Sequence, residues 1–425
     1  MIMDWQVWFA GILFVVVYAV IISEKIHRTI IALFGAVLLL VLGVLLQHEA
    51  VSYIDFNTIG LLTGMMIIVG IARKSGMFEY MAVKAAHYSQ GDPARILIAL
   101  GIVTAVASAF LDNVTTVLLI LPVTIAICKS LEINPIPFFV TEIMASNIGG
   151  TATLIGDPPN IMIGSATGFG FMDFIVNLSP VIIVIFVITI LILKLIYKDQ
   201  LQTSEENKAK IRSMDPDDFI KDMIILKKSL VVIALVIIGF ILHQRLGLES
   251  ATIALTGAAL LLLLTREDPE EVLLTVEWST LFFFIGLFIM VGGLVKVGII
   301  ERLAREAVAL TNGNLNATAF LVLWFSAVAS AFIDNIPFVA TFIPLIKEIG
   351  IIGHMSVEPL WWALSLGACL GGNGTIIGAS ANVIVSGIAE RHGCPITFLG
   401  YMKIAFPLML LSVVIASLYL WAFFL

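Results

Sequence analysis

Residues 107–163 decide the fold: they begin ASAFLDNVTTVLLILPVTIAI at 107–127 and continue FFVTEIMASNIGGTATLIGDPPNIMI at 138–163. The pattern returns 222 positions later as ASAFIDNIPFVATFIPLIKEI at 329–349 and LGACLGGNGTIIGASANVIV at 366–385. Asp112 matches Asp334 and Gly156 matches Gly378 with no gap between them. Because the matched residues are polar ones and glycines, and not only apolar ones, the sequence predicts two copies of one unit.

The composition indicates a membrane protein. Of 425 residues, 60% are hydrophobic and only 12% are charged, against about a quarter charged in soluble proteins. Apolar runs of membrane-spanning length recur along the chain, so we expect a multi-pass protein of the cell (inner) membrane, in contact with the lipid bilayer. The net charge of −7 indicates no nucleic-acid partner. Three cysteines without a CxxC pair exclude a disulfide framework, and no nucleotide-binding loop is present, so we expect no cofactor and no enzyme.

Hydropathy divides the chain into two similar halves. The first repeat, 1–198, has predicted spans at 5–22, 29–46, 58–72 and 173–197, a helical hairpin at 95–128 and a broken helix at 138–165. The second repeat, 229–425, has predicted spans at 229–244, 251–265, 279–295 and 403–424, a hairpin at 316–349 and a broken helix at 358–388. The hydrophilic segment 199–228 joins them, and its basic residues place it in the cytoplasm by the positive-inside rule.

The expected fold is all-α, with five transmembrane helices and one re-entrant hairpin in each repeat. An odd number of crossings gives the second copy the opposite orientation, which makes an inverted-topology repeat. The arms of each hairpin look shorter than the roughly 20 residues that a span needs, so both hairpins are expected to enter and leave on one side. Glycine pairs and the Pro-Pro of 158–159 interrupt the broken helices.

Two hairpin tips and two broken helices would meet near the membrane midplane, where helix ends offer unpaired backbone groups. Oxygen ligands suit hard cations, so we predict an ion- or proton-binding site made of Asp112, Asn113, Thr115, Thr116, Asp334 and Asn335. Na⁺, if it is the coupling ion, would be held by Asp112, Asn113, Asp334 and Asn335. The solute site is predicted to contain Asn147, Gly150, Thr151, Thr153, Asp157, Asn160, Asn373, Thr375, Ser380 and Asn382.

Structural roles compete with each of these assignments. Asp112 and Asp334 are well placed to cap helices, although a carboxylate inside a membrane is a functional candidate by default. Asn113 and Asn335 could instead hold helices together by hydrogen bonds. The two roles are compatible, because a residue that closes a helix end can also face a ligand.

Two further residues have open roles, and the site segments are short of positive charge. Asp157 has no acidic counterpart in the second copy, so it is either a site residue or the start of an Asp-Pro-Pro turn. Cys369 takes the place of Asn147 and is more typical of core packing. No Lys or Arg occurs in 97–127, 138–165 or 359–388, which favours a cation, a proton or a neutral solute over a multiply charged anion.

The motifs FLDNVTTVLLILPVTI, NIGGTATLIGDPPN, FIDNIPFVATFIP and LGACLGGNGTIIGASANVI resemble those of the ion transporter superfamily of ArsB, NhaD and citrate-transporter-like permeases. The sequence is most similar to the branch that contains the melanosomal P protein. The resemblance implies inverted repeats, a homodimer and an elevator-like movement. The superfamily's dicarboxylate carriers have Ser-Asn-Thr at the hairpin tips, whereas this chain has Asp112-Asn113-Val114 and Asp334-Asn335-Ile336. This difference favours the ArsB/NhaD side, where arsenite or antimonite, or Na⁺, is exchanged for protons.

The sequence therefore predicts a secondary active transporter that works by alternating access, with Na⁺ or H⁺ as the coupling ion. A Na⁺-coupled anion or carboxylate transporter is the main alternative, followed by an anion channel. An intramembrane aspartyl protease built on two paired aspartates and a purely structural scaffold fit the repeated polar motifs less well. Some ArsB relatives work with a soluble ATPase, a partner that the sequence of this chain does not indicate.

Overall fold

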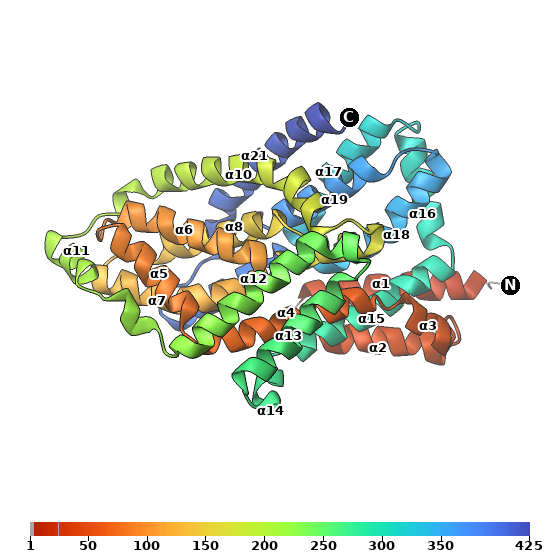
Figure 1. Ribbon diagram of the computed structural model, residues 1–425. Coiled ribbons are helices and arrows are strands. Elements are labelled where there is room, and N and C mark those ends of the chain that lie inside the picture. The colour runs from red at the N-terminus through yellow and green to blue at the C-terminus, as the bar shows by residue number, and fades with distance from the viewer. Residues whose placement is uncertain (1–3, 24) are drawn as a thin grey trace.

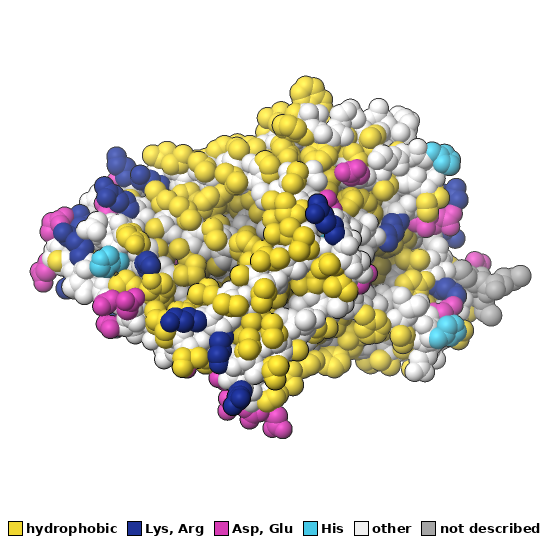
Figure 2. Space-filling model, in the orientation of Figure 1, with side chains coloured by type: hydrophobic (Ala, Val, Ile, Leu, Met, Phe, Trp, Pro, Cys, Tyr) yellow, Lys and Arg dark blue, Asp and Glu magenta, His cyan; other side chains and the backbone are white. Residues whose placement is uncertain are grey.

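The structure is a computed structural model that describes residues 4–23 and 25–425, and these residues form helices and no strand. Ten of the described helices are long and apolar enough to cross a membrane, and two shorter apolar helices, Arg28–Val41 and Ser250–Thr265, accompany them. Figure 2 shows hydrophobic side chains over much of the middle of the molecule, and charged side chains gathered at its two ends and at its lower edge, with a few Lys or Arg side chains right of the centre. The prediction of an all-helical, multi-pass membrane protein is confirmed.

The first copy of the repeat contains α1 (Asp4–Ser23), α2 (Arg28–Val41), α3 (Gln47–Tyr53), α4 (Phe56–Lys74), α5 (Met77–Tyr88), α6 (Pro93–Phe110), α7 (Asn113–Leu131), α8 (Ile136–Thr151), α9 (Pro158–Thr167) and α10 (Phe171–Ile196). The second contains α12 (Met223–Leu246), α13 (Ser250–Thr265), α14 (Pro269–Leu273), α15 (Trp278–Lys296), α16 (Ile299–Leu310), α17 (Leu315–Phe332), α18 (Asn335–Gly353), α19 (Glu358–Gly371), η3 (Ile376–Gly378), α20 (Ser380–Arg391) and α21 (Phe398–Phe423).

The helix bounds repeat with the sequence. Helices α15, α16, α17 and α18 have the bounds of α4, α5, α6 and α7 moved by 222 positions. Figure 1 shows α5 near one end of the long dimension of the molecule and its counterpart α16 near the other. Counterparts at opposite ends are what oppositely oriented copies would show.

Side-chain caps fix where the hairpin helices begin. The Asp92 carboxylate accepts a hydrogen bond from the backbone N–H of Arg95 at 2.9 Å, and Pro93 occupies the first helical position of α6. Asp112 accepts from the N–H of Thr115 at 2.8 Å and so starts α7. These are the residue types that satisfy the free N–H groups of a helix N-terminus. The break between α6 and α7 therefore follows from local sequence.

The hairpin arms are longer than the sequence argument assumed. Helix α6 has 18 residues and α7 has 19, and each is long and apolar enough to cross a membrane. The expectation that the arms are too short was wrong, because α6 starts before residue 95 and α7 continues to Leu131 through the polar residues Lys129 and Ser130. Re-entry from one side remains a prediction.

Glycines allow the broken helices to lie close to the hairpins. A Cβ atom on Gly149 of α8 would be 2.2 Å from the carbonyl oxygen of Ala105 in α6. A Cβ atom on its counterpart Gly371 in α19 would be 2.4 Å from the carbonyl oxygen of Ala327 in α17. Only glycine permits this approach. After these helices the backbone is irregular until α9 and α20 begin, so the interruptions predicted within 138–165 and 358–388 are present.

The segment between the halves is folded onto the first copy. It contains η1 (Lys198–Gln200), α11 (Glu205–Arg212) and η2 (Pro216–Phe219), and α12 begins at Met223, inside the segment that the sequence assigned to the linker. The Asn207 amide and the Thr203 hydroxyl donate to the carbonyl of Leu131 at 3.2 and 2.6 Å. The segment thereby provides hydrogen-bond donors for the carbonyl oxygen of Leu131, the last residue of α7.

Candidate functional site

A small cavity of about 40 Å³ lies where the N-terminal ends of α2, α7, α9, α15, α18 and α20 come together. Its polar lining is Arg28, Asp112, Asn113, Asp157, Glu277, Thr280, Asn335 and Ser380. A space of this size holds a cation or a few water molecules. Helix N-termini attract negative charge, and the carboxylates of the lining supply it. The site is thus built from both repeats at a convergence of helix ends.

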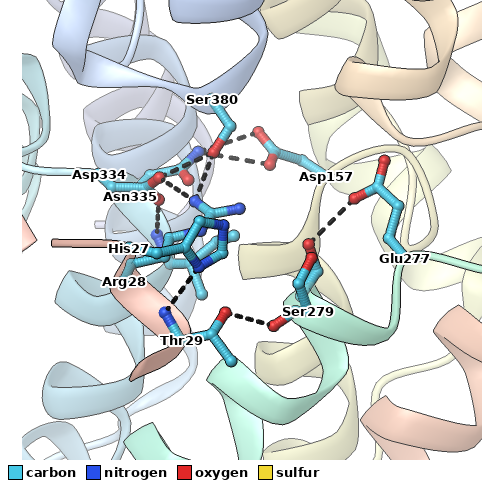
Figure 3. Close-up of polar contacts among 11 residues, drawn as sticks. His27, Arg28, Thr29, Asp157, Glu277, Ser279, Asp334, Asn335 and Ser380 are labelled. Carbon is cyan, nitrogen blue, oxygen red and sulfur yellow. Dashed lines mark hydrogen bonds and ion pairs between the residues drawn. The ribbon is translucent and has the colours of Figure 1, made fainter. Parts of the chain in front are cut away.

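An ion pair lies beside this cavity, and one of its partners, Arg28, lines it (Figure 3). Nη1 of Arg28 lies 2.8 Å from Oδ2 of Asp334 and donates to the Ser380 hydroxyl at 2.7 Å. Ser380 in turn donates to Oδ2 of Asp334 at 2.9 Å. All three residues line a second cavity of about 290 Å³, together with the exposed side chains of Ile22 and Ile26, whereas only Arg28 and Ser380 of the three line the small cavity. The cluster of Arg28, Asp334 and Ser380 therefore separates a surface cavity from the small inner one.

The tip of the first hairpin combines capping with exposure to the cavity. Both Asp112 oxygens are engaged by Thr115, through its N–H and its hydroxyl. Asn113 accepts a hydrogen bond from Ser108 at 2.7 Å and donates to Asn147 at 3.2 Å. The capping and helix-joining roles are thus both present, while Asp112 and Asn113 still line the cavity.

The two repeats meet through amide side chains. Asn147 of α8 donates to Asn373 at 2.9 Å and to Asn382 at 3.0 Å. Asn335, at the second tip, lies with its amide nitrogen 3.3 and 3.4 Å from the two oxygens of Asp157. Asp157 makes no capping hydrogen bond to α9. Asp157 therefore lies on the cavity and faces the tip of the second hairpin, and its side chain does not cap the turn that begins α9.

Other predicted solute-site residues brace the irregular backbone. Asn160 donates to the carbonyls of Thr151 and Thr153 at 3.1 and 2.9 Å. Its counterpart Asn382 donates to the carbonyls of Gly372 and Thr375 at 2.7 and 2.9 Å. The predicted residues that do not line the small cavity are Thr115, Thr116, Asn147, Gly150, Thr151, Thr153, Asn160, Asp334, Asn373, Thr375 and Asn382. Of these, Thr115 and Asn147 contact lining residues directly, and Asp334 lines the surface cavity.

Gly150 and Cys369 act through packing. A Cβ atom on Gly150 would lie 2.4 Å from Oδ1 of Asn113, so this glycine lets the hairpin tip sit against α8. Cys369 is fully buried, with its sulfur 3.7 Å from Oδ1 of Asn160. Neither lines the cavity.

Two charged residues that line the cavity were not among the predicted site residues. Arg28 lies between the predicted spans 5–22 and 29–46, whereas in the structure it opens α2 and brings the positive charge that the site segments lack. Of the four residues predicted to hold Na⁺, Asp112, Asn113 and Asn335 line the small cavity, whereas Asp334 is paired with Arg28. The Na⁺ site stays a prediction. Within the described residues, no three His, Cys, Asp or Glu side chains lie close enough to hold a metal ion.

Glu277 is the second charged lining residue that was not predicted, and the internal repeat could have indicated it. It precedes α15 and accepts a hydrogen bond from Thr280 at 3.0 Å. Its counterpart 222 positions earlier is Asp55, which caps α4 through the N–H groups of Asn57 and Thr58. Two acidic residues at matching helix starts would have marked this position. No sequence pattern would have placed Arg28, because its side-chain hydrogen bonds are with residues more than 300 positions away.

Comparisons with known proteins agree with this architecture. Residues 18–367 match the citrate transporter family. The chain is 45% identical over 415 residues to an uncharacterized transporter of Mycobacterium tuberculosis, covering 96% of each protein. It is 42% identical over 415 residues to a 46 kDa membrane protein of Mycobacterium leprae, again over 96% of each. The human P protein is 36% identical over 504 residues, which are 98% of this chain and 60% of that protein.

Solved transporter structures share the fold. The YdaH transporter of Alcanivorax borkumensis superposes with a TM-score of 0.62 at 15% identity, covering 98% of this chain and 96% of that one. MtrF of Neisseria gonorrhoeae, described as illuminating a class of antimetabolite efflux pumps, gives a TM-score of 0.60 at 13% identity, covering 88% and 82%. At such identities the likeness shows the fold alone. Together with the sequence relatives, it confirms the resemblance drawn from the motifs.

Proposed function

Because this chain belongs to the citrate transporter family, we propose that it is an ion-coupled secondary active transporter that moves a small inorganic solute in exchange for protons. The solute would be Na⁺ or a metalloid such as arsenite or antimonite. The observation that carries this proposal is the charge of the small cavity. Asp112, Asp157 and Glu277 line it, and within the described part of the chain none of them forms an ion pair.

The arrangement of these carboxylates favours a proton as one of the two ions. A proton needs a single carboxyl group, whereas Na⁺ needs several oxygens at once. The carboxylates stand on different helix ends and are not grouped in threes. Any one of them can therefore take up a proton, while the amide oxygens of Asn113 and Asn335 add neutral ligands for a cation.

Alternating access would open the small cavity to each side of the membrane in turn. The cluster of Arg28, Asp334 and Ser380 lies between this cavity and the surface cavity of about 290 Å³. Separation of the cluster would join the two spaces. A movement of the hairpin tip that carries Asp334 relative to α2, which carries Arg28, would produce this opening.

A Na⁺-coupled anion or carboxylate transporter is the second candidate, and Arg28 is the observation that favours it. Its guanidinium borders both cavities, and α20 begins beside it with no side-chain cap on its free N–H groups. Such helix ends bind anions. The cation reading remains the better supported one, because Arg28 is already paired with Asp334 while three carboxylates on the cavity are not.

The test uses proteoliposomes that enclose a pH-sensitive dye. Wild type is exposed to a Na⁺ gradient, an arsenite gradient and a citrate gradient with Na⁺, each over a range of concentrations. We expect a saturable pH change with Na⁺ or arsenite, abolished in Asp112→Asn and Asp157→Asn. Glu301→Gln is the matched control, since Glu301 is exposed on α16 and pairs only with Arg305. Flux with citrate alone would replace the first candidate by the second, and a response that never saturates would indicate a channel.

A further inference from the structure

A buried glutamate away from the cavity has no role in the site described above. Glu142 lies in the middle of α8 and is 1% exposed. Thr124 of α7 donates a hydrogen bond to its Oε1, whereas its Oε2 has no hydrogen-bond partner. A buried polar atom without a partner costs about 1–3 kcal/mol, and an ionisable group inside a membrane is expensive as well. A buried group with this cost is therefore a candidate for a functional role.

Several polar side chains of α7 and α8 lie at intervals between Glu142 and the hairpin tip. The Asn113–Asn147 contact and the Thr124–Glu142 contact join α7 and α8 at two levels. Between these levels lie Thr116 of α7 and Ser146 of α8. Both are fully buried, and both have a hydroxyl without a partner. Ser146 is one helical turn from Glu142 and therefore on the same face of α8. We call Thr116, Thr124, Glu142 and Ser146 the polar seam.

The second repeat shows that packing does not require the polar seam. The residues 222 positions after Thr116, Thr124, Glu142 and Ser146 are Phe338, Ile346, Leu364 and Ala368. All four are buried in the corresponding helices α18 and α19. The same helix pair is thus built once with a polar interior and once with an apolar one. Because the apolar version folds, the polar version in the first repeat has a purpose other than stability.

The surroundings of Glu142 suit a single titrating group. Helices α6, α7, α10, α19, α20 and α21 pack against α8, and within the described residues none brings a cation into an ion pair with Glu142. The nearest titratable side chain on α7 is the thiol of Cys128, one turn beyond Thr124, and Glu142 acts on it electrostatically. No cation therefore holds the Glu142 carboxyl group in its ionised form.

We propose that Glu142 is a proton-binding residue and that the polar seam carries the proton between Glu142 and the cavity at the Asp112 tip. The carboxylate takes a proton from the side where α8 begins at Ile136, about two turns away. The hydroxyls of Ser146 and Thr116 can each accept and donate a hydrogen bond. Neither has a partner in this conformation, so they would pass the proton toward the cavity carboxylates when movement of α7 and α8 during transport brings them into hydrogen-bond distance. Since the second repeat has no such seam, protons would follow this route on one side of the membrane only. This inference rests on the proposed proton-coupled transport.

The first test does not depend on transport. Infrared spectra of the reconstituted full chain are recorded over a pH titration for wild type and Glu142→Gln. We expect one component of the carbonyl stretch of protonated carboxyl groups to titrate in wild type and to be missing in the variant. Identical spectra for the two proteins would overturn the proposal.

The second test measures coupling. A pH gradient of one unit supports about tenfold solute accumulation for each coupled proton. We expect Glu142→Gln to lose this accumulation while the protein still exchanges labelled solute across the membrane. Accumulation equal to that of wild type would refute the role of Glu142. If wild type itself moves no solute, the proposed function fails, and the infrared titration still decides whether Glu142 binds a proton.

A variant copied from the second repeat guards against simple unfolding. Thr124→Ile combined with Glu142→Leu reproduces the residues Ile346 and Leu364, which pack well at the corresponding place. We expect this double variant to fold, to lack the infrared component and to be uncoupled. A folded double variant that still accumulates solute would overturn the proposal.

Discussion

The ion pair between Arg28 and Asp334 gives the sharpest stability prediction. Its nitrogen and oxygen are 2.8 Å apart, and the side chains are 25% and 15% exposed. Arg28→Met would leave the Asp334 carboxylate with only the Ser380 hydroxyl as a side-chain partner. Removing one partner of a fully buried pair costs 3–5 kcal/mol, and the partial exposure of this pair lowers the expected cost to about 2–3 kcal/mol.

A double-mutant cycle separates the pair from its surroundings. Asp334→Asn in the Arg28→Met background removes the stranded charge, so the two single effects should not add, with a coupling energy of about 1–2 kcal/mol. Unfolding can be followed with a thiol-reactive dye, because Cys128 and Cys369 are buried in the folded protein. For 425 residues the unfolding entropy scales to about 0.9 kcal/mol/K, so Arg28→Met should lower the Tm by about 2–3 °C.

The control for this cycle is Arg305→Met, which removes an exposed ion pair on α16 with side chains 63% and 50% exposed. We expect no measurable change in its Tm. A Tm change in Arg28→Met no larger than that in Arg305→Met would refute a stabilising role of the Arg28–Asp334 ion pair. Additive effects of Arg28→Met and Asp334→Asn would refute it as well.

Three further results are expected. Gly150→Ala should reduce both the Tm and the transport rate, since the new Cβ atom would lie 2.4 Å from Oδ1 of Asn113. Gly387→Ala on α20 is the control and should change neither quantity, because its Cβ atom meets nothing within 4 Å. Asn147→Ala should lower the free energy of unfolding by several kcal/mol in a denaturant titration, because Asn113, Asn373 and Asn382 each lose one buried hydrogen bond at about 1–3 kcal/mol each. Asn177→Ala, which loses one hydrogen bond to a backbone carbonyl, should lower it by less. A maleimide should label Cys394 in the folded protein and leave Cys128 and Cys369 unmodified until denaturation, which mass spectrometry would show; labelling of Cys369 in the native state would contradict its burial.

The sequence alone predicted the membrane class, the internal repeat and the breaks in the helices. These features are local or periodic. Asp112 caps α7 through a residue three positions away, and the Gly-rich and Pro-Pro segments interrupt helices wherever they occur. The repeat could be read because polar residues and glycines recur at a constant offset of 222 positions. The helix bounds then repeated with the same offset.

Only the tertiary structure decided which polar residues face the cavity and which stand behind it. Asn160 and Asp157 are three positions apart, yet one braces backbone carbonyls and the other faces the opposite hairpin tip. Arg28 and Glu277 reach the cavity from helix ends outside the motifs. Local sequence fixes where a helix begins, because caps and breakers act within one turn. The direction in which that helix end points depends on contacts hundreds of residues away, and these contacts set the charge of the cavity.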